Sequence, residues 1–311
     1  MGYAYTILQQ VIVMFILAFA GYVLFKKGKI SQEGSKAIAN ILIYLSLPCV
    51  IINGFLVERT TENMKGLGIS AIMALIALLA SILISRIVMG KNAIENFAGA
   101  FSNPGFFGIP IIMASISQSA VFYIAAYIAY INLGQWTYGV GMLVAEKEGA
   151  KGNPFKGILK KLFTAPFMVG IVIGLFFFFS GLSMPSIPLK CVTFLANCNT
   201  PLAMFTIGIY LAQTDIAQTF KKWRLYLLSA VRLVFSPLVA MALLTLLPND
   251  YFELKMAVLI GTACPVGSNV AVYAQLYDSD YSYAVETVVV STLLSIVTMP
   301  AIVALATYLW C

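Results

Sequence analysis

The stretches SNPGFFGIP (Ser102–Pro110) and ACPVGSNVA (Ala263–Ala271) each place a proline in the middle of a long apolar run. A proline inside a helix removes a backbone hydrogen bond and clashes with the preceding turn, at a cost of about 3 kcal/mol. We therefore predict two helices that are interrupted at Pro104 and Pro265. One such break is equally well explained as a packing kink, whereas two breaks at matching depth favour a functional explanation.

The composition places these runs in a lipid bilayer. Of the 311 residues, 61% are hydrophobic and 10% are charged, and the mean hydropathy is +0.93, whereas a soluble globular domain carries about 25% charged residues. With about 20 apolar residues per crossing, the length fits about ten helices. We expect an all-α, multi-pass protein of the cell inner (plasma) membrane without a soluble domain.

The residue inventory argues against an enzyme. The chain has no histidine, and its five cysteines form no close pair, which removes the usual His-based nucleophile pairs and thiolate metal sites. It also has no glycine-rich phosphate loop and no paired membrane aspartates. We expect no catalytic residue, metal or cofactor. The net charge of +7 is typical of one face of a membrane protein rather than of a nucleic-acid partner.

Apolar runs bounded by charged residues or by Pro and Gly clusters predict ten membrane-spanning helices. No basic segment precedes the first run and no small-residue cleavage site follows it, so we expect a retained helix and not a secretory signal. The ten runs cover residues 6–25, 37–57, 67–89, 96–115, 121–144, 162–181, 189–213, 225–247, 254–277 and 282–309.

The distribution of Lys and Arg predicts the orientation in the membrane. Of the 19 basic residues, fourteen lie in the odd-numbered connections and four in the even-numbered ones. Cytoplasmic loops carry the excess of Lys and Arg, so we assign the odd connections to the cytoplasm and both termini to the outside. The fourteen are Lys26, Lys27, Lys29, Lys36, Arg86, Lys91, Lys147, Lys151, Lys156, Lys160, Lys161, Lys221, Lys222 and Arg224.

The two halves of the chain are predicted to be repeats. The polar segment 145–161 is a predicted cytoplasmic linker between two five-helix domains, 1–144 and 162–311. Pro48 and Pro201 occupy corresponding positions in the second and seventh spans, and the two interrupted spans correspond as well. Because five is an odd number, the second half enters the membrane from the opposite side, which makes the repeat inverted.

Both breaks fall near the membrane midplane. Measured from the predicted helix starts, Pro104 lies about 12 Å deep and Pro265 about 16 Å deep, in a hydrocarbon core about 30 Å thick. Half-helices that start near Gly105 and Gly267 would present free N–H groups and positive dipole ends there, which attract anions. Matching broken helices in two inverted halves are typical of the substrate site of a secondary transporter.

Polar residues beside the breaks are the candidate substrate ligands. Taken singly, each is also explained as an interhelical hydrogen-bonding residue. The candidates are Ser102, Asn103, Gly105, Gly267, Ser268 and Asn269, followed by Asn53, Asn132, Gln135, Asn197 and Asn199 in nearby spans.

Two charged residues, Arg232 and Glu286, fall inside predicted spans, where each costs about 2.5 to 3.5 kcal/mol at the helix centre. Both helices start on the basic side, so the two side chains could pair. The pair would serve coupling, with an anion-attracting Arg and a Glu that releases it or carries a proton. The alternatives are a structural ion pair, or an Arg232 side chain that extends to the cytoplasmic headgroups.

These motifs resemble the auxin efflux carrier family, which includes the plant auxin exporters and prokaryotic organic-acid permeases. The resemblance spans nearly the whole chain, with motifs in both halves. It runs through NPGFFGIPI (Asn103–Ile111), ACPVGSNVAVYAQLY (Ala263–Tyr277), STLLSIVTMP (Ser291–Pro300) and NTPLAMFTIG (Asn199–Gly208).

The resemblance implies ten helices in two inverted five-helix repeats, in an elevator-type fold of the bile-acid symporter kind. Helices one, two, six and seven would form a scaffold that dimerises, and helices three to five and eight to ten a transport domain. Helices four and nine would cross at their breaks. Asn103 falls where the plant carriers place an asparagine that touches the substrate carboxylate, although they follow it with Thr where this chain has Pro104. The short central loop favours a prokaryotic permease over a hormone exporter.

The sequence therefore predicts a secondary transporter that moves small organic anions, mono- or dicarboxylates such as malate or auxin-like acids, by alternating access. One alternative is a sodium-coupled symporter of the bile-acid type, which needs a carboxylate among the oxygen ligands near the crossing. Another is a membrane receptor or scaffold that does not transport.

Overall fold

The computed structural model describes residues 2–148 and 165–311. Most of the predicted linker, 145–161, therefore lies outside the described residues. Within them the protein is helical, with no strand and one isolated β-bridge between Ser102 and Val266. Helical residues occupy each of the ten predicted ranges as far as the structure describes them.

Six helices in the described part of the chain are long and apolar enough to cross a membrane, and the protein is a multi-pass membrane protein. Two shorter apolar helices accompany them, Pro104–Ser115 and Pro166–Ser180. The six are Tyr5–Lys26, Gln32–Phe55, Thr61–Met89, Ser186–Gln213, Trp223–Leu244 and Tyr281–Trp310.

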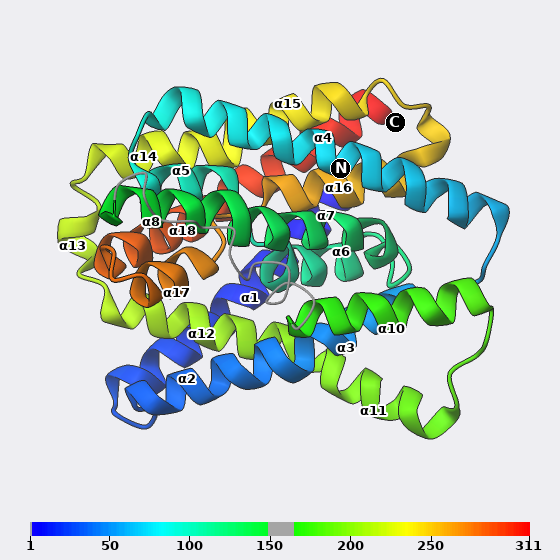
Figure 1. Ribbon diagram of the computed structural model, residues 1–311, viewed down its shortest axis with the longest axis horizontal. Coiled ribbons are helices and arrows are strands. Elements are labelled where there is room, and N and C mark those ends of the chain that lie inside the picture. The colour runs from blue at the N-terminus through cyan, green and yellow to red at the C-terminus, as the bar shows by residue number, and fades with distance from the viewer. Residues whose placement is uncertain (1, 149–164) are drawn as a thin grey trace.

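Several of these helices contain a π-helical turn or a kink, so they carry more than one label (Figure 1). The first half comprises α1 (Gly2–Lys26), α2 (Gln32–Ile41), η1 (Leu42–Ser46), α3 (Leu47–Phe55), α4 (Thr61–Met89), α5 (Ala93–Ala100), η2 (Pro104–Gly108), α6 (Ile109–Ser115), α7 (Val121–Gly134), η3 (Gln135–Gly139) and α8 (Val140–Glu148). The second half comprises α10 (Pro166–Ser180), α11 (Ser186–Asn197), α12 (Asn199–Gln213), α13 (Ile216–Thr219), α14 (Trp223–Ala230), η5 (Val231–Phe235), α15 (Ser236–Leu244), η6 (Asn249–Tyr251), α16 (Phe252–Ala263), α17 (Asn269–Leu276) and α18 (Tyr281–Trp310).

Helices from both halves of the chain lie side by side. Figure 1 shows α2, α3, α10, α11 and α12 along the lower side of the molecule and α4, α5, α14 and α15 along the upper side. Helix α1 packs along α12 and also contacts α6 and α18. The approach of α1 to α12 is so close that a Cβ atom on Gly208 would lie 1.8 Å from the carbonyl oxygen of Ala18. Small residues of this kind let membrane helices pack backbone to backbone.

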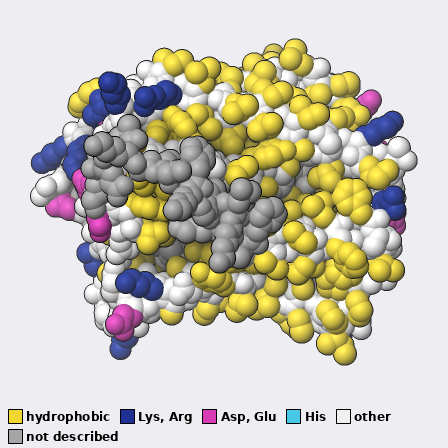
Figure 2. Space-filling view, viewed as in Figure 1, with side chains coloured by type: hydrophobic (Ala, Val, Ile, Leu, Met, Phe, Trp, Pro, Cys, Tyr) yellow, Lys and Arg dark blue, Asp and Glu magenta, His cyan; other side chains and the backbone are white. Residues whose placement is uncertain are grey.

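Both chain termini lie at one end of the molecule. The ring of Tyr3 is 5.5 Å from that of Phe252, and the indole N–H of Trp310 donates to the hydroxyl of Thr245 across 2.9 Å. The start of α18 meets the end of α12 at the opposite end, where Tyr281 contacts Gln213. Lys and Arg side chains gather densely at one end of the view in Figure 2, with a broad hydrophobic band beside them.

Candidate functional site

Each interrupted helix stops just before its proline. Helix α5 ends at Ala100, and the chain becomes helical again only at Pro104. Helix α16 ends at Ala263, and Cys264 is extended, with φ −60° and ψ 149°. A proline disfavours helical dihedrals in the residue before it and suits the first turn of a new helix. Pro104 thus begins the new helix itself, whereas after Pro265 the chain becomes helical again only at Asn269.

The two extended segments cross and pair with each other. The backbone N–H of Asn103 donates to the carbonyl oxygen of Pro265, and the N–H of Gly267 donates to that of Phe101, both across 3.0 Å. The N–H of Val266 donates to the hydroxyl of Ser291 on α18 across 3.1 Å. These bonds satisfy polar backbone groups that would otherwise be unpaired in an apolar interior.

Gly267 makes this close crossing possible. A Cβ atom at this position would lie 2.9 Å from the carbonyl oxygen of Ser102, which belongs to the facing backbone and cannot move aside. The missing side chain therefore allows the two backbones to reach hydrogen-bonding distance.

Arg232 caps the ends of both helices that lead into the crossing. Its side chain is 0% exposed. One terminal nitrogen donates to the carbonyl oxygens of Ala100, across 2.9 Å, and Gly99, across 3.3 Å. The other donates to the carbonyl oxygen of Thr262 in the last turn of α16. The guanidinium thus neutralises the partial negative charge that gathers at the two carbonyl ends.

The predicted pairing of Arg232 with Glu286 is wrong, and so is the alternative in which Arg232 extends to the headgroups. The carboxylate of Glu286 accepts two hydrogen bonds from the ammonium group of Lys222, at 2.6 and 2.8 Å. Glu286 lies in the second turn of α18, whereas Arg232 lies about 12 Å further along its helix than Arg224. The freed carbonyl groups at that depth attract the guanidinium inward.

A second charged cluster joins three helix starts. The guanidinium of Arg224 binds both oxygens of Glu95, and the hydroxyl of Tyr283 donates to one of them across 2.8 Å. Glu95 is buried, with 1% of its surface exposed. The cluster ties α5, α14 and α18 together at the end of the molecule opposite the termini.

A small cavity of about 30 Å³ lies at the crossing. This volume holds water but not an organic acid, because a water needs roughly 10–15 Å³ and pockets for small molecules measure about 300–1,000 Å³. In this conformation the cavity is therefore too small for an organic acid. The cavity is lined by Leu47, Ser102, Asn103, Pro104, Gly105, Phe106, Ile128, Ile131, Asn132, Gln135, Gly267, Ser268 and Asn269.

Two polar side chains facing this cavity have no partner among the described residues. The residues Asn103 and Ser268 are 6% and 4% exposed and line the cavity, and within the described part of the chain neither side chain makes a hydrogen bond. Their donors and acceptors are therefore available to a ligand or water in the cavity.

Free backbone N–H groups lie beside these side chains. Within the described residues, no hydrogen bond from the N–H of Gly105, Phe106, Ser268 or Asn269 to any other group is present. These four groups belong to the first turns of the half-helices that begin at Pro104 and Asn269. Orphan N–H groups and a positive dipole end at one point form an anion site.

The other predicted ligands are already engaged within the protein. The hydroxyl of Ser102 donates to the carbonyl oxygen of Gly261 across 2.8 Å. The amide of Asn269 donates to the side-chain oxygen of Gln135 across 2.8 Å. Of the further candidates, Asn132 lines the cavity and Asn197 is exposed.

Asn199 lies on α12, outside the two interrupted helices, and its side chain contacts the crossing. Its amide nitrogen on α12 donates to the carbonyl oxygen of Gly105 across 3.1 Å. From α3, the side chain of Leu47 covers the same glycine, with its Cδ1 atom 3.2 Å from where a Cβ atom would be. Leu47 carried no signal in the sequence, because an apolar residue is common in membrane helices. Ser291 begins one of the motifs of the family resemblance, but the sequence did not indicate its contact with the crossing.

The π-helical turns of the described chain gather around this site. Their residues include the cavity residues Pro104 and Gln135 and the capping residue Arg232, and a further turn ends immediately before Leu47. A π-helical turn re-aims the side chains of a helix and is frequent at functional sites. This distribution supports the assignment of the site to the crossing.

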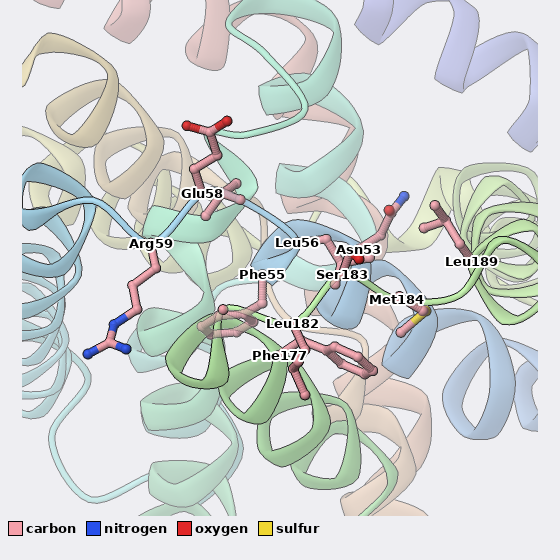
Figure 3. Close-up of a pocket in the computed structure, with 12 residues that line it drawn as sticks. Asn53, Phe55, Leu56, Glu58, Arg59, Phe177, Leu182, Ser183, Met184 and Leu189 are labelled. Carbon is pink, nitrogen blue, oxygen red and sulfur yellow. The ribbon is translucent and has the colours of Figure 1, made fainter.

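A larger cavity of about 680 Å³ lies elsewhere, between α3, α10 and α11. Figure 3 shows Glu58 and Arg59 at its border with their charged groups pointing away from the other lining side chains. Arg59 donates to the carbonyl oxygen of Phe179 across 2.9 Å. Asn53 lies in this cavity and not at the crossing. Since the lining is mainly apolar and its charged groups are turned away, we do not assign the functional site to it.

Comparisons with known proteins agree on one class. The model of a family described as "Membrane transport protein" matches residues 6–303. A protein of Rhizobium meliloti (strain 1021) named "Putative malonate transporter" is 24% identical over 301 residues, which cover 93% of this chain and 92% of that protein. An uncharacterized transporter of Methanocaldococcus jannaschii is 24% identical over 304 residues, covering 93% and 95%. An uncharacterized transporter of Methanothermobacter thermautotrophicus is 22% identical over 302 residues, covering 94% and 96%.

Proposed function

Because this chain belongs to the membrane transport protein family, we propose that it is a secondary transporter of small organic anions and that the crossing is its substrate site. Family membership confirms the predicted resemblance to the auxin efflux carriers. The description of the family gives transport across a membrane. We propose the substrate class and the transport mechanism.

One observation supports the substrate class above all. Four free N–H groups and the unpartnered side chains of Asn103 and Ser268 converge on one buried cavity at the crossing. A carboxylate offers acceptor atoms that match these donors, and the dipole ends favour negative charge. The name of the Rhizobium meliloti relative points to a small dicarboxylate. We take malonate as the first acid to test.

The proposed mechanism is alternating access of the elevator type. Ten crossings would form two inverted five-helix repeats with both termini outside. The helices that carry α1, α2–α3, α10 and α11–α12 would form the scaffold, and the remaining helices the transport domain. In support, Asn199 and Leu47 contact Gly105 from α12 and α3, so these contacts would break when the transport domain moves. A homodimer through the scaffold completes the proposal.

A sodium-coupled symporter of the bile-acid type finds no support at this site. No Asp or Glu is among the residues that line the described cavity, and Glu286 is engaged by Lys222. A symporter of this type needs a carboxylate among the oxygen ligands near the crossing.

Uptake by proteoliposomes tests the proposal. Vesicles that contain the purified protein and unlabelled malonate inside should accumulate radiolabelled malonate by exchange, and equal uptake is expected in sodium and potassium buffers. A panel of mono- and dicarboxylates added outside should compete with the label. Binding of malonate without exchange would favour a receptor, and uptake that requires sodium would favour the symporter.

A further inference from the structure

We propose that the crossing accepts one negative charge, so that a dicarboxylic acid is bound and carried as its singly protonated monoanion. This inference rests on the proposed function and concerns the charge of the substrate at the same site. It follows from the charges that the fold places around the crossing.

The positive charge of Arg232 balances the partial negative charges at the C-terminal ends of α5 and α16. A helix end carries about half an elementary charge, so the carbonyl ends of α5 and α16 together carry about one negative charge. Arg232 donates to carbonyl groups of both ends and carries one positive charge. Arg232 is 0% exposed, so water does not solvate its charge. The carbonyl oxygens at the ends of α5 and α16 therefore act as its counter-charge.

The N-terminal ends of the two half-helices have no counter-charge among the residues that line the described cavity. The half-helices that begin at Pro104 and Asn269 together present about one positive charge to the cavity. One carboxylate balances this charge. Its two oxygens offer about four acceptor sites, which is fewer than the donors that the free N–H groups, Asn103 and Ser268 present together.

A second carboxylate would find no such balance. All thirteen residues that line the described cavity are uncharged. The charged groups of Glu95 and Arg224 bind each other at the far end of α5. An unpaired charge in this interior is strongly disfavoured, so the second carboxyl group has to bind in its protonated form.

The protein itself provides few groups that titrate in the relevant range. The chain has no histidine, the side chain that ordinarily changes charge between pH 5 and pH 8. The titratable groups beside Arg232 are the hydroxyl of Tyr127 and the thiol of Cys264, and side chains of these types are neutral at pH 7. Any pH dependence of dicarboxylate binding in this range should therefore come from the acid.

Calorimetric titration of the detergent-solubilised protein tests the inference with malonate and with its monomethyl ester. The two probes share one skeleton, but the ester has only one ionisable carboxyl group. From about pH 5 to about pH 8, the dissociation constant of the ester should stay unchanged. That of malonate should rise about tenfold per pH unit above its second pKa, because the monoanion becomes that much rarer.

The outcomes separate the two proposals. Malonate that binds as tightly when fully ionised as when singly ionised, beside an ester that binds normally, would overturn the charge limit and leave the substrate site in place. Failure of both probes to bind at any pH would remove the proposed function and the charge limit with it. Parallel weakening of both probes would assign the pH dependence to the protein and overturn the inference.

Discussion

Asn103 donates its backbone N–H to the carbonyl oxygen of Pro265 across 3.0 Å, although the two residues lie in opposite halves of the chain. Each belongs to the segment where a helix is interrupted, so the bond joins the two breaks into one element. The same segments carry the free N–H groups and unpartnered side chains of the cavity. The backbone pairing of the two segments and the proposed binding of a carboxylate therefore depend on the same local backbone conformation.

Removal of the Asn103 amide should weaken carboxylate binding and leave the fold intact. Asn103→Ala loses a hydrogen bond to a charged group, which contributes about 1.5–3 kcal/mol, so the dissociation constant for malonate should rise about 10- to 100-fold. Calorimetric titration measures the change. Asn197→Ala, which alters an exposed asparagine of α11, is the matched control and should bind as the wild type does. Equal affinity in both variants would remove Asn103 from the site.

A methyl group on Gly267 should destabilise the crossing. Gly267→Ala places a Cβ atom 2.9 Å from a facing carbonyl oxygen, and overpacking of this kind costs about 1–3 kcal/mol. The melting temperature in detergent should fall. Gly68→Ala on α4 has no neighbour within 4 Å and should keep or raise it, since Ala suits a helix better than Gly by about 1 kcal/mol. A Gly267→Ala protein as stable as the Gly68→Ala protein would show that the close approach is not required.

Arg232 and Glu286 should act independently. Their side chains bind different partners, so the effects of Arg232→Met and Glu286→Gln on unfolding should add within about 0.5 kcal/mol. Arg232→Met should be the more harmful, because it leaves buried carbonyl oxygens of α5 and α16 unpaired, at about 1–3 kcal/mol each. Loss of the partly exposed Lys222 contact should cost about 1 kcal/mol or less. A coupling energy well above about 0.5 kcal/mol would instead indicate that Arg232 and Glu286 form a direct ion pair.

Truncation of Leu47 should admit a bulkier acid. Its side chain covers Gly105 at the cavity, and Leu47→Ala leaves room for about one methyl branch. In competition with labelled malonate, methylmalonate should gain about 10-fold or more relative to the wild type, the usual scale for one methylene in a pocket. Leu45→Ala on the same helix alters a side chain that is 49% exposed and should leave the ratio unchanged. An unchanged ratio in Leu47→Ala would place the substrate elsewhere.

The sequence predicted the features that follow from local chemistry. Prolines at 104 and 265 have no place inside a regular helix, so the interruptions could be located. Hydropathy predicted ten membrane-spanning helices, and six helices of the described chain are long and apolar enough to cross a membrane. The partners of Arg232 could not be predicted in this way. A sequence shows that an arginine lies deep in an apolar run, but not that two distant helices end beside it. The same limit applies to Leu47, which reaches the cavity only through the packing of α3.

A crystal of the protein grown with 3-bromopropionate shows whether a carboxylate binds at the crossing, because the anomalous signal of bromine locates the acid without any assumption about its position. We expect a peak beside the crossing, with the carboxylate within hydrogen-bonding distance of the N–H groups of Gly105 and Ser268 and of the amide of Asn103. A peak in the larger cavity between α3, α10 and α11, and none at the crossing, would contradict this expectation.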